Sequence, residues 1–387
     1  MLQDTAVVFH LPAKIMQSSA KHIPIPIHIP IASADPLDAI AAVTHPWPYP
    51  YYRRLALQKT LRWDAALKLW IAADPALIRE VMRHPDCLVR PLMQAVPAAI
   101  DGPAGAVFGE LARMNEFERH ATRRAAVDQV LATIGEEKAA RHARKVASLL
   151  LQSGADHVIR PQQLNDFVRE APVRTMASLL GFADAELARI ARWTQAFAAC
   201  VSPLANTAQI TAQIAAAHDA APLLLAALRR LPATSTANAP HEDARLANLL
   251  GMLSQTYEAS AGLLGNCIVA ACNGALVDTE DDAARLVQAT MRDDPPVHNT
   301  RRFAARDLTI GGASVQAGQA ILLILATPAG DERFGHGHHR CPGSRLAQII
   351  AAQSLHALLT HATLPPLRWR YRPSPNARLP EFLEDLQ

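Results

Sequence analysis

The sequence is poor in the features that mark several large classes of protein. Charged residues make up 19% of the 387 residues and the formal net charge is +3, and no basic stretch alternates with aromatic residues, which argues against nucleic-acid binding. No run of about eighteen uncharged apolar residues occurs, so we expect no membrane-spanning helix. The cysteines are scattered and odd in number, unlike a disulfide framework: Cys87, Cys200, Cys267, Cys272 and Cys341. These absences favour a soluble, cytoplasmic protein.

The N-terminal region is distinguished by proline. Residues 22–33 (HIPIPIHIPIAS) carry proline at alternate positions, which forbids a helix and favours an extended arm. The preceding residues lack the cationic start and continuous apolar core of a signal peptide. We therefore expect residues 1–34 to form a proline-rich extension and residues 35–387 to form the folded domain, which is long enough for a large core.

The rest of the chain has a composition typical of a helical protein. Half of its residues are hydrophobic (50%), whereas aromatic residues contribute only 5%. Helical periodicity is present at 75–84, 117–133, 136–152, 164–181, 184–200 and 206–231, and in a very long stretch from Asp243 to Ala275. Segments 61–73, 309–325 and 369–382 have the pattern of short hairpins. The sequence thus predicts a mainly α fold with small β-hairpins.

One ten-residue segment, FGHGHHRCPG (Phe334 to Gly343), is the most informative part of the chain. Cys341 ends a glycine-rich turn and directly precedes an apolar helical stretch. The unpaired N–H groups at a helix start favour a thiolate, which is the metal-binding form of cysteine. Gly335 and Gly337 allow positive φ angles or close approach to a flat, bulky group. Cys341 is therefore a candidate metal ligand.

Two other interpretations of this segment remain open. A lone cysteine before a helix is usually a small buried hydrophobe. Alternatively, His336, His338, His339 and Cys341 together could bind zinc. Structural zinc sites, however, usually take ligands from separated pairs, and no second pair with suitable spacing occurs.

The segment resembles the haem-binding signature of the cytochrome P450 family, F-x-x-G-x-[HR]-x-C-x-G, at every defined position. The order of expected elements from about residue 35 onward is also similar to that family. The resemblance implies the P450 fold, haem b (iron protoporphyrin IX) as cofactor, and Cys341 as the axial thiolate ligand. It further implies that Phe334, Gly335, His339 and Gly343 surround the haem.

The resemblance extends to four positions that would bind the haem propionates. His120 and Arg124 lie four residues apart in FERHATRRAAVDQVL, similar to the H-x-x-x-R of the family's C helix. Arg302 resembles the arginine that follows the family's K helix, and His339 would donate beside the cysteine loop. Propionates buried with haem need such partners. An exposed basic helix face is the alternative interpretation of His120 and Arg124.

The long helix departs from the family pattern A-G-x-[DE]-T. At that place the chain has QTYEAS, residues 255–260. Glu258 keeps the acid, whereas Ala259 stands where the family has a hydroxyl, and Ser260 is turned away from that position by about 100°. We predict Glu258, Gln255 and Ser260 as the catalytic residues. Simple core packing is the alternative, but polar groups in an apolar helix centre are costly without partners.

The K helix departs from the family pattern E-x-x-R. Arg292 is present, but Ala289 replaces the glutamate, and the following meander, with its partner arginine, is shortened. We expect Arg292 to turn toward solvent, toward Asp293 or Asp294, or toward a backbone carbonyl. These losses put haem retention and stability in question.

The resemblance implies a haem-thiolate monooxygenase that inserts one oxygen atom of O2 into a small, apolar, secondary-metabolite-like organic substrate. Because the chain has no flavin or dinucleotide domain, electrons would come from a ferredoxin or flavodoxin with its reductase. Arg333, Arg340 and Arg345 would offer that partner a basic face. A peroxide-driven enzyme, a haem-thiolate isomerase or dehydratase, and a non-catalytic haem-binding protein remain alternatives.

Overall fold

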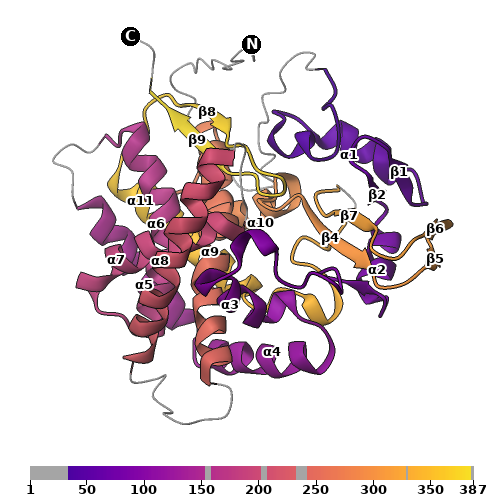
Figure 1. The fold of residues 1–387 in the computed structure, drawn as a ribbon. Coiled ribbons are helices and arrows are strands. Elements are labelled where there is room, and N and C mark those ends of the chain that lie inside the picture. Colours follow the sequence, from indigo (N-terminus) through magenta and orange to yellow (C-terminus); the bar gives the residue numbers. More distant parts are fainter. Residues whose placement is uncertain (1–33, 153–157, 202–206, 232–241, 328–329, 385–387) are drawn as a thin grey trace.

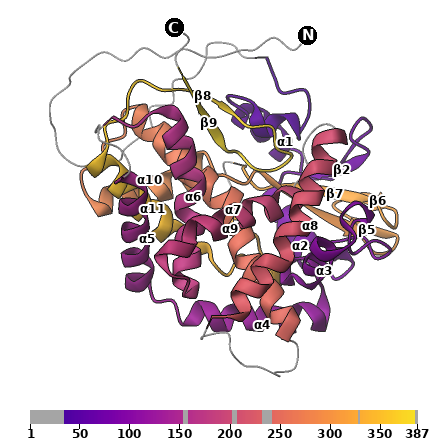
Figure 2. The same cartoon turned by 60° about the vertical axis from the view of Figure 1, so that its left-hand side comes forward.

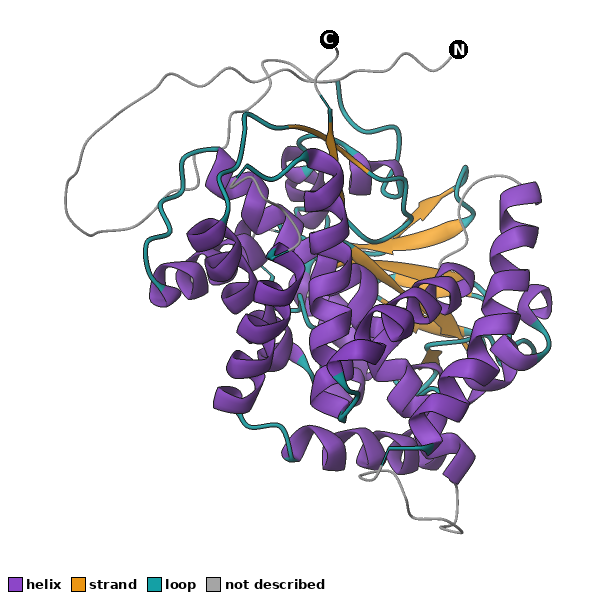
Figure 3. Cartoon of the chain, turned by 90° about the vertical axis from the view of Figure 1, so that its left-hand side faces the viewer, coloured by secondary structure: helices purple, strands orange, loops and turns teal. Residues whose placement is uncertain are grey.

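Helices form most of the molecule (Figure 3), and most strands lie at one side of it, whereas the C-terminal hairpin lies apart from them at the top of the view in Figure 1. The computed structural model describes residues 34–152, 158–201, 207–231, 242–327 and 330–384, so the expected N-terminal extension lies almost wholly outside the described residues. The helices are α1 (Tyr49–Ala56), α2 (Pro75–Arg83), α3 (Pro103–Glu110), α4 (Phe117–Ala132), α5 (Glu136–Leu151), α6 (Pro161–Leu180), α7 (Asp184–Val201), α8 (Thr207–Arg229), α9 (Glu242–Cys272), α10 (Glu280–Asp293) and α11 (Ser344–His361). The predicted mainly α fold is confirmed.

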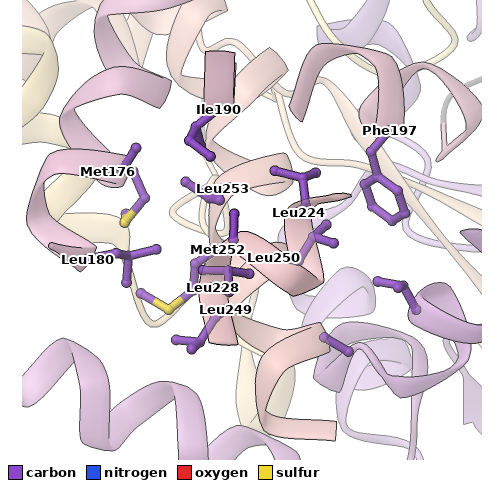
Figure 4. Packing of buried hydrophobic residues seen from close by; sticks show 14 of the residues in the cluster. Met176, Leu180, Ile190, Phe197, Leu224, Leu228, Leu249, Leu250, Met252 and Leu253 are labelled. Carbon is purple, nitrogen blue, oxygen red and sulfur yellow. The ribbon is translucent and has the colours of Figure 1, made fainter. Parts of the chain in front are cut away.

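Helix α9 passes through the middle of the helical part, and α4 crosses beneath it (Figure 2). Helix α9 spans 31 residues, and buried side chains lie on all of its faces, as expected of a helix inside a large core. Side chains from α6, α7, α8 and α9 meet in one apolar cluster (Figure 4). The cluster includes Phe108 and Phe197, which are core residues.

Helix α8 contains a segment, Ile210–Arg229, that is apolar and long enough to cross a membrane by length and composition alone. This segment has a mean hydropathy of 1.2, and 28% of it is buried inside the structure. Leu224 and Leu228 are fully buried in the cluster with α9. The apolar character of α8 is therefore used, at least in part, for packing against α9.

The strands form one five-stranded sheet and two hairpins. The sheet has the order β1-β2-β7-β4-β3, and only β2 and β7 pair in parallel. The expected hairpins are all present: β1 with β2, β5 with β6, and β8 with β9. The strands are β1 (Arg62–Asp64), β2 (Leu69–Ala72), β3 (Cys87–Leu88), β4 (Asn299–Ala304), β5 (Leu308–Ile310), β6 (Ala313–Val315), β7 (Ala320–Ile324), β8 (Arg368–Tyr371) and β9 (Pro380–Leu383).

Strand β4 directs two neighbouring arginines to opposite sides. Arg302 is buried and pairs in register with Ile321 of β7, whereas Arg301 is exposed. Successive strand residues alternate in direction, so only one of the two side chains can point inward.

The buried ion pair between Arg378 and Asp294 joins three distant parts of the chain. Arg378 is 2% exposed, and its Nε lies 2.6 Å from Asp294 Oδ1, at the end of α10. Its other guanidinium nitrogens donate to the carbonyls of residues 43, 45 and 46 at 2.7–3.1 Å. The guanidinium also stacks 3.4 Å above the ring of Tyr371 in β8, and the Tyr49 and Tyr371 hydroxyls donate to Asp294.

We predict that Arg378→Met lowers the free energy of unfolding by about 3–5 kcal/mol, because one partner of a buried ion pair is removed. Chemical denaturation would measure this change. The control is Arg306→Met, which breaks the exposed pair with Asp86 and is expected to cost less than about 1 kcal/mol. Equal effects of the two substitutions would contradict the prediction.

Candidate functional site

All the site residues predicted from the sequence line one cavity of about 410 Å³. The cysteine loop and the residues just before α11 contribute Phe334, Gly335, His339, Cys341 and Gly343. Helix α4 contributes His120 and Arg124, and strand β4 contributes Arg302. Helix α9 contributes Gln255, Glu258 and Ser260. These residues are far apart in the sequence, and the fold brings them together around a single space.

The backbone of the cysteine loop has the geometry that its glycines predict. Gly335 and Gly337 have φ angles of 75° and 69°, in the region that favours glycine. The Cys341 N–H donates to the Phe334 carbonyl at 2.8 Å, which closes the loop on itself. A short 3₁₀ helix, η5 (Gly337–His339), precedes the cysteine, and α11 begins three residues after it.

The expected lowering of the Cys341 pKa is not found. Burial among protein atoms raises the pKa of this thiol, although its side chain is open to the cavity. The Gly343 N–H and the charges of Arg124 and Arg340 act in the opposite direction, as predicted for a helix start, but they are weaker than desolvation. The free thiol is therefore the favoured form, and coordination to a metal would release its proton.

The residues predicted to bind the propionates cluster beside the cysteine loop. His120 is 6% exposed, and its ring centroid lies 4.3 Å from that of His339. Arg124 donates from Nη1 to the carbonyls of His338 and Arg340 at 3.1 and 2.9 Å, and its Nε pairs with Asp128 at 2.8 Å. Arg124 thus fixes the backbone on the N-terminal side of the cysteine.

Arg302 has an unusual environment for a buried guanidinium. It is 5% exposed, and among the described residues its side chain makes one hydrogen bond, to the carbonyl of Arg301 at 2.8 Å. A buried charge normally has several partners. The donors of Arg302 are therefore available for an anionic group in the cavity.

Glu116 belongs to this cluster and was missed by sequence reasoning. Its carboxylate lies 3.0 Å from His339 Nε2 and 3.2 Å from His338 Nε2, and it accepts the Val89 N–H at 2.7 Å. Burial would raise the pKa of Glu116, but the contacts with both histidines and Val89 outweigh it and lower the pKa to about 2. Its position at the start of α4, four residues before His120, was the available signal.

The zinc interpretation that included Cys341 finds no support in the described part of the chain. The group found there with ligand atoms close enough to share an ion, all within 4.8 Å, is Glu116, His338 and His339. Neither Cys341 nor His336 belongs to it.

On α9 the polar side chains at the cavity are partly turned back to their own helix. Gln255 Nε2 donates to the Gly251 carbonyl at 2.9 Å, and Thr256 Oγ1 donates to the Met252 carbonyl at 2.7 Å. Ser260 is 5% exposed, whereas Glu258 and Ala259 are more open to the cavity. The Thr256 hydroxyl therefore does not replace the hydroxyl missing at Ala259.

Arg113 is a second cavity residue that sequence reasoning missed. It lies in η3 (Ala112–Met114), between α3 and α4. Burial lowers the pKa of its guanidinium to about 10, and the negative charge of Glu258 opposes this shift. No sequence motif marks this position.

The K-helix region compensates for its missing glutamate through other contacts. Arg292 turns outward and pairs with Asp293 at 2.7 Å, one of the orientations that we expected. Arg333, just before the cysteine loop, instead donates to the Arg292 carbonyl at 2.7 Å. Glu332 is 3% exposed and pairs with Arg79 of α2 at 2.5 Å. The loop is thus tied to α10 and α2 although Ala289 stands in the place of the glutamate.

Comparison with known proteins places this arrangement in a family. No family model matches the chain. It is 26% identical to the mycinamicin IV hydroxylase/epoxidase of Micromonospora griseorubida over 298 residues, 68% of this chain and 74% of that protein. It is also 26% identical over 368 residues to the putative cytochrome P450 123 of Mycobacterium bovis, covering 81% of this chain and 87% of that protein. The chain belongs to the cytochrome P450 family.

The fold agrees with this assignment. P450BioI, solved in complex with an acyl carrier protein ligated to hexadec-9Z-enoic acid, matches with a TM-score of 0.74 at 18% identity. The match covers 87% of this chain and 97% of that chain. Members of the P450 family are haem-thiolate monooxygenases, and haem b is the cofactor of the family.

The residues of the cavity fit haem. A thiol at one wall, Cys341, supplies the ligand atom that P450 iron requires. Arg302 offers buried donors with one partner among the described residues, as propionates need. A Cβ added at Gly343 would meet no atom within 4 Å, so the backbone borders open space beside the cysteine. His120, Arg124 and His339, the other residues predicted to bind the propionates, line the same cavity.

We predict that Arg302→Leu weakens haem binding roughly tenfold or more, because a charged hydrogen-bond donor to a buried anion is lost. The ratio of Soret to protein absorbance after transfer of haem to excess apomyoglobin measures this change. Arg301→Leu is the matched control, since the neighbouring side chain is exposed. Haem loss at the same rate from both variants would show that Arg302 does not hold the propionates.

Proposed function

We propose that this P450 is a monooxygenase that inserts one oxygen atom of O2 into a small, apolar organic substrate of the secondary-metabolite type. The observation that carries the proposal is the placement of Cys341 in the same cavity as Glu258. A thiol ligand on the Cys-loop side and a carboxyl on α9 are the two groups that oxygen activation needs from the protein.

Each group in the cavity has a defined task in this proposal. Haem, when bound, would supply the oxygen-activating chemistry. Cys341 would hold the iron as a thiolate, while His120, Arg124, Arg302 and His339 would hold the propionates. Glu258 delivers protons toward the α9 side, with Gln255 and Ser260 orienting water there. The apolar walls exclude other water from the site.

The electrons come from a separate ferredoxin or flavodoxin with its reductase, and the protein acts in the cytoplasm without a membrane. Of the three arginines that we expected to form the docking face for this partner, two have partners within the chain. Arg333 is partly buried and bonded to backbone carbonyls, and Arg345 pairs with Glu136 at 2.8 Å. Arg340 is exposed and remains available on that face.

A peroxide-driven reaction is the second candidate function. It is favoured by Ala259, which offers no hydroxyl to the cavity, and by Thr256, whose hydroxyl bonds to its own helix. Hydrogen peroxide already carries the protons that must be added to O2 in the oxygenase reaction. A reaction with peroxide as oxidant therefore does not require α9 to deliver these protons. An isomerase, a dehydratase and a non-catalytic haem protein are the remaining alternatives.

The first test is the carbon monoxide difference spectrum of the reduced protein and of Cys341→Ser. We expect the strongly red-shifted Soret band of thiolate ligation in the natural chain and its loss in the variant. The Cys272→Ser variant, which changes a cysteine away from the cavity, is the control. A thiolate band that survives in Cys341→Ser would refute the assignment of the ligand. Absence of haem from the natural chain would favour the non-catalytic alternative.

The second test restores the missing hydroxyl. Because Ala259 lines the cavity, Ala259→Thr is expected to lower the fraction of reducing equivalents released as hydrogen peroxide. A positioned proton donor contributes about 10²-fold or more to such a step. A surrogate ferredoxin and reductase supply electrons, and peroxide is assayed directly. Ala259→Val has nearly the same shape without the hydroxyl, so equal peroxide release from the two variants would contradict the oxygenase mechanism drawn here.

A further inference from the structure

Arg113 is a cationic side chain on the wall of the haem cavity to which the proposed mechanism assigns no task. It lines the cavity together with Glu258 and Cys341, and its side chain is open to that space. Among the described residues it makes no hydrogen bond within 3.5 Å and no ion pair within 4.0 Å. Its guanidinium is nevertheless surrounded by enough protein to lower its pKa.

The backbone that carries Arg113 is fixed against α9. The Ala112 N–H donates to Asn248 Oδ1 at 2.7 Å, and Asn248 Nδ2 returns a bond to the Glu110 carbonyl at 2.8 Å. Leu111 packs against Gly251, where an added Cβ would lie 2.7 Å from Leu111 Cδ2. The arginine is therefore held in place before any ligand arrives, which reduces the entropy cost of binding.

The charges around the cavity fall into two groups. Beside the cysteine loop, Glu116 interacts electrostatically with His120, His339 and Arg302. The pKa of Arg113 responds to Glu258 on α9 and to none of these residues. Arg113 thus belongs to the α9 side of the cavity, apart from the residues that fit the propionates.

No hydrogen-bond or ion-pair partner of the Arg113 side chain is found in the described chain, and this side chain is exposed at the cavity, so its donors are available to an anionic group of a ligand. Carboxylates match the planar fork of arginine with two parallel hydrogen bonds. The same cavity is lined by apolar side chains, among them Met176, Ala198 and Met252. A ligand that satisfies both features has an apolar body and one carboxylate.

We propose that Arg113 binds the carboxylate of the substrate, so that this P450 acts on free organic acids with an apolar body. The proposal rests on the proposed function and adds its substrate class. Glu258 carries a like charge near the same place when ionised, so the carboxylate binds on the far side of Arg113 from Glu258. The apolar body of the acid then extends along the remaining wall.

Binding of matched probes to the haem-loaded protein tests this proposal. Decanoate, 1-decanol and methyl decanoate are titrated by calorimetry and by the Soret shift, in the natural chain and in Arg113→Gln. We expect decanoate to bind at least about tenfold more tightly than the two neutral probes, and Arg113→Gln to weaken decanoate alone by roughly 10- to 100-fold. Arg113→Lys, which keeps the charge without the fork, should recover part of the loss.

Arg141→Gln is the control, because Arg141 is an exposed residue of α5 paired with Glu137. Equal affinities for acid and alcohol, no binding of decanoate, or unchanged binding in Arg113→Gln would each overturn the proposal. Loss of haem from Arg113→Gln would also overturn it, by making the residue a propionate partner. The carbon monoxide spectrum of the same samples reports separately on thiolate ligation, so failure of the proposed function is recognised independently of the decanoate result.

Discussion

The ion pair of Arg378 with Asp294 sets the position of the cavity wall that lies beside the start of β4. A guanidinium buried this deeply has lost its hydration, and only a complete set of partners repays that loss. Those partners anchor the segment that ends at Arg378: the Arg378 N–H donates to the Pro296 carbonyl at 2.7 Å, and Asn376 and Ala377, directly before it, line the cavity. Gly262 of α9 permits the contact, because an added Cβ would lie 2.7 Å from the Arg378 carbonyl.

This network explains how the fold tolerates the loss of the K-helix glutamate. With Ala289 in that place, Arg292 would be a buried charge without a partner, and it turns to Asp293 at the surface instead. The end of the same helix is held by Asp294, one residue further on. Arg333 and Glu332 then connect the cysteine loop to its surroundings. Arg292 has thus moved to the surface, while Glu332 and Arg333, which are buried or partly buried, keep partners, as stability requires.

The sequence predicted what depends on neighbouring residues and missed what depends on distant ones. The cysteine loop is contiguous, so its glycines and helix start were sufficient to locate Cys341, and the helices followed from their periodicity. Glu116 meets His339 across a separation of 223 residues, and no local pattern records that contact. The predicted lowering of the Cys341 pKa was wrong for a related reason. The helix start, which lowers the pKa, was visible in the sequence, whereas burial, which raises it more strongly, depends on the whole fold.

The departures on α9 and the presence of Arg113 belong to one feature of the cavity. The hydroxyls of Ser254 and Thr256 and the amide of Gln255 each donate to a carbonyl of their own helix, so these groups add little donor capacity to the open space. Beyond them, Glu258 and Arg113 both line the cavity, and the charge of Glu258 acts on the pKa of Arg113. In a cavity of low dielectric, two opposite charges dominate over a neutral hydroxyl. This part of the cavity is therefore polarised by its charges, and the absence of a hydroxyl at Ala259 changes that polarisation less than loss of Arg113 would.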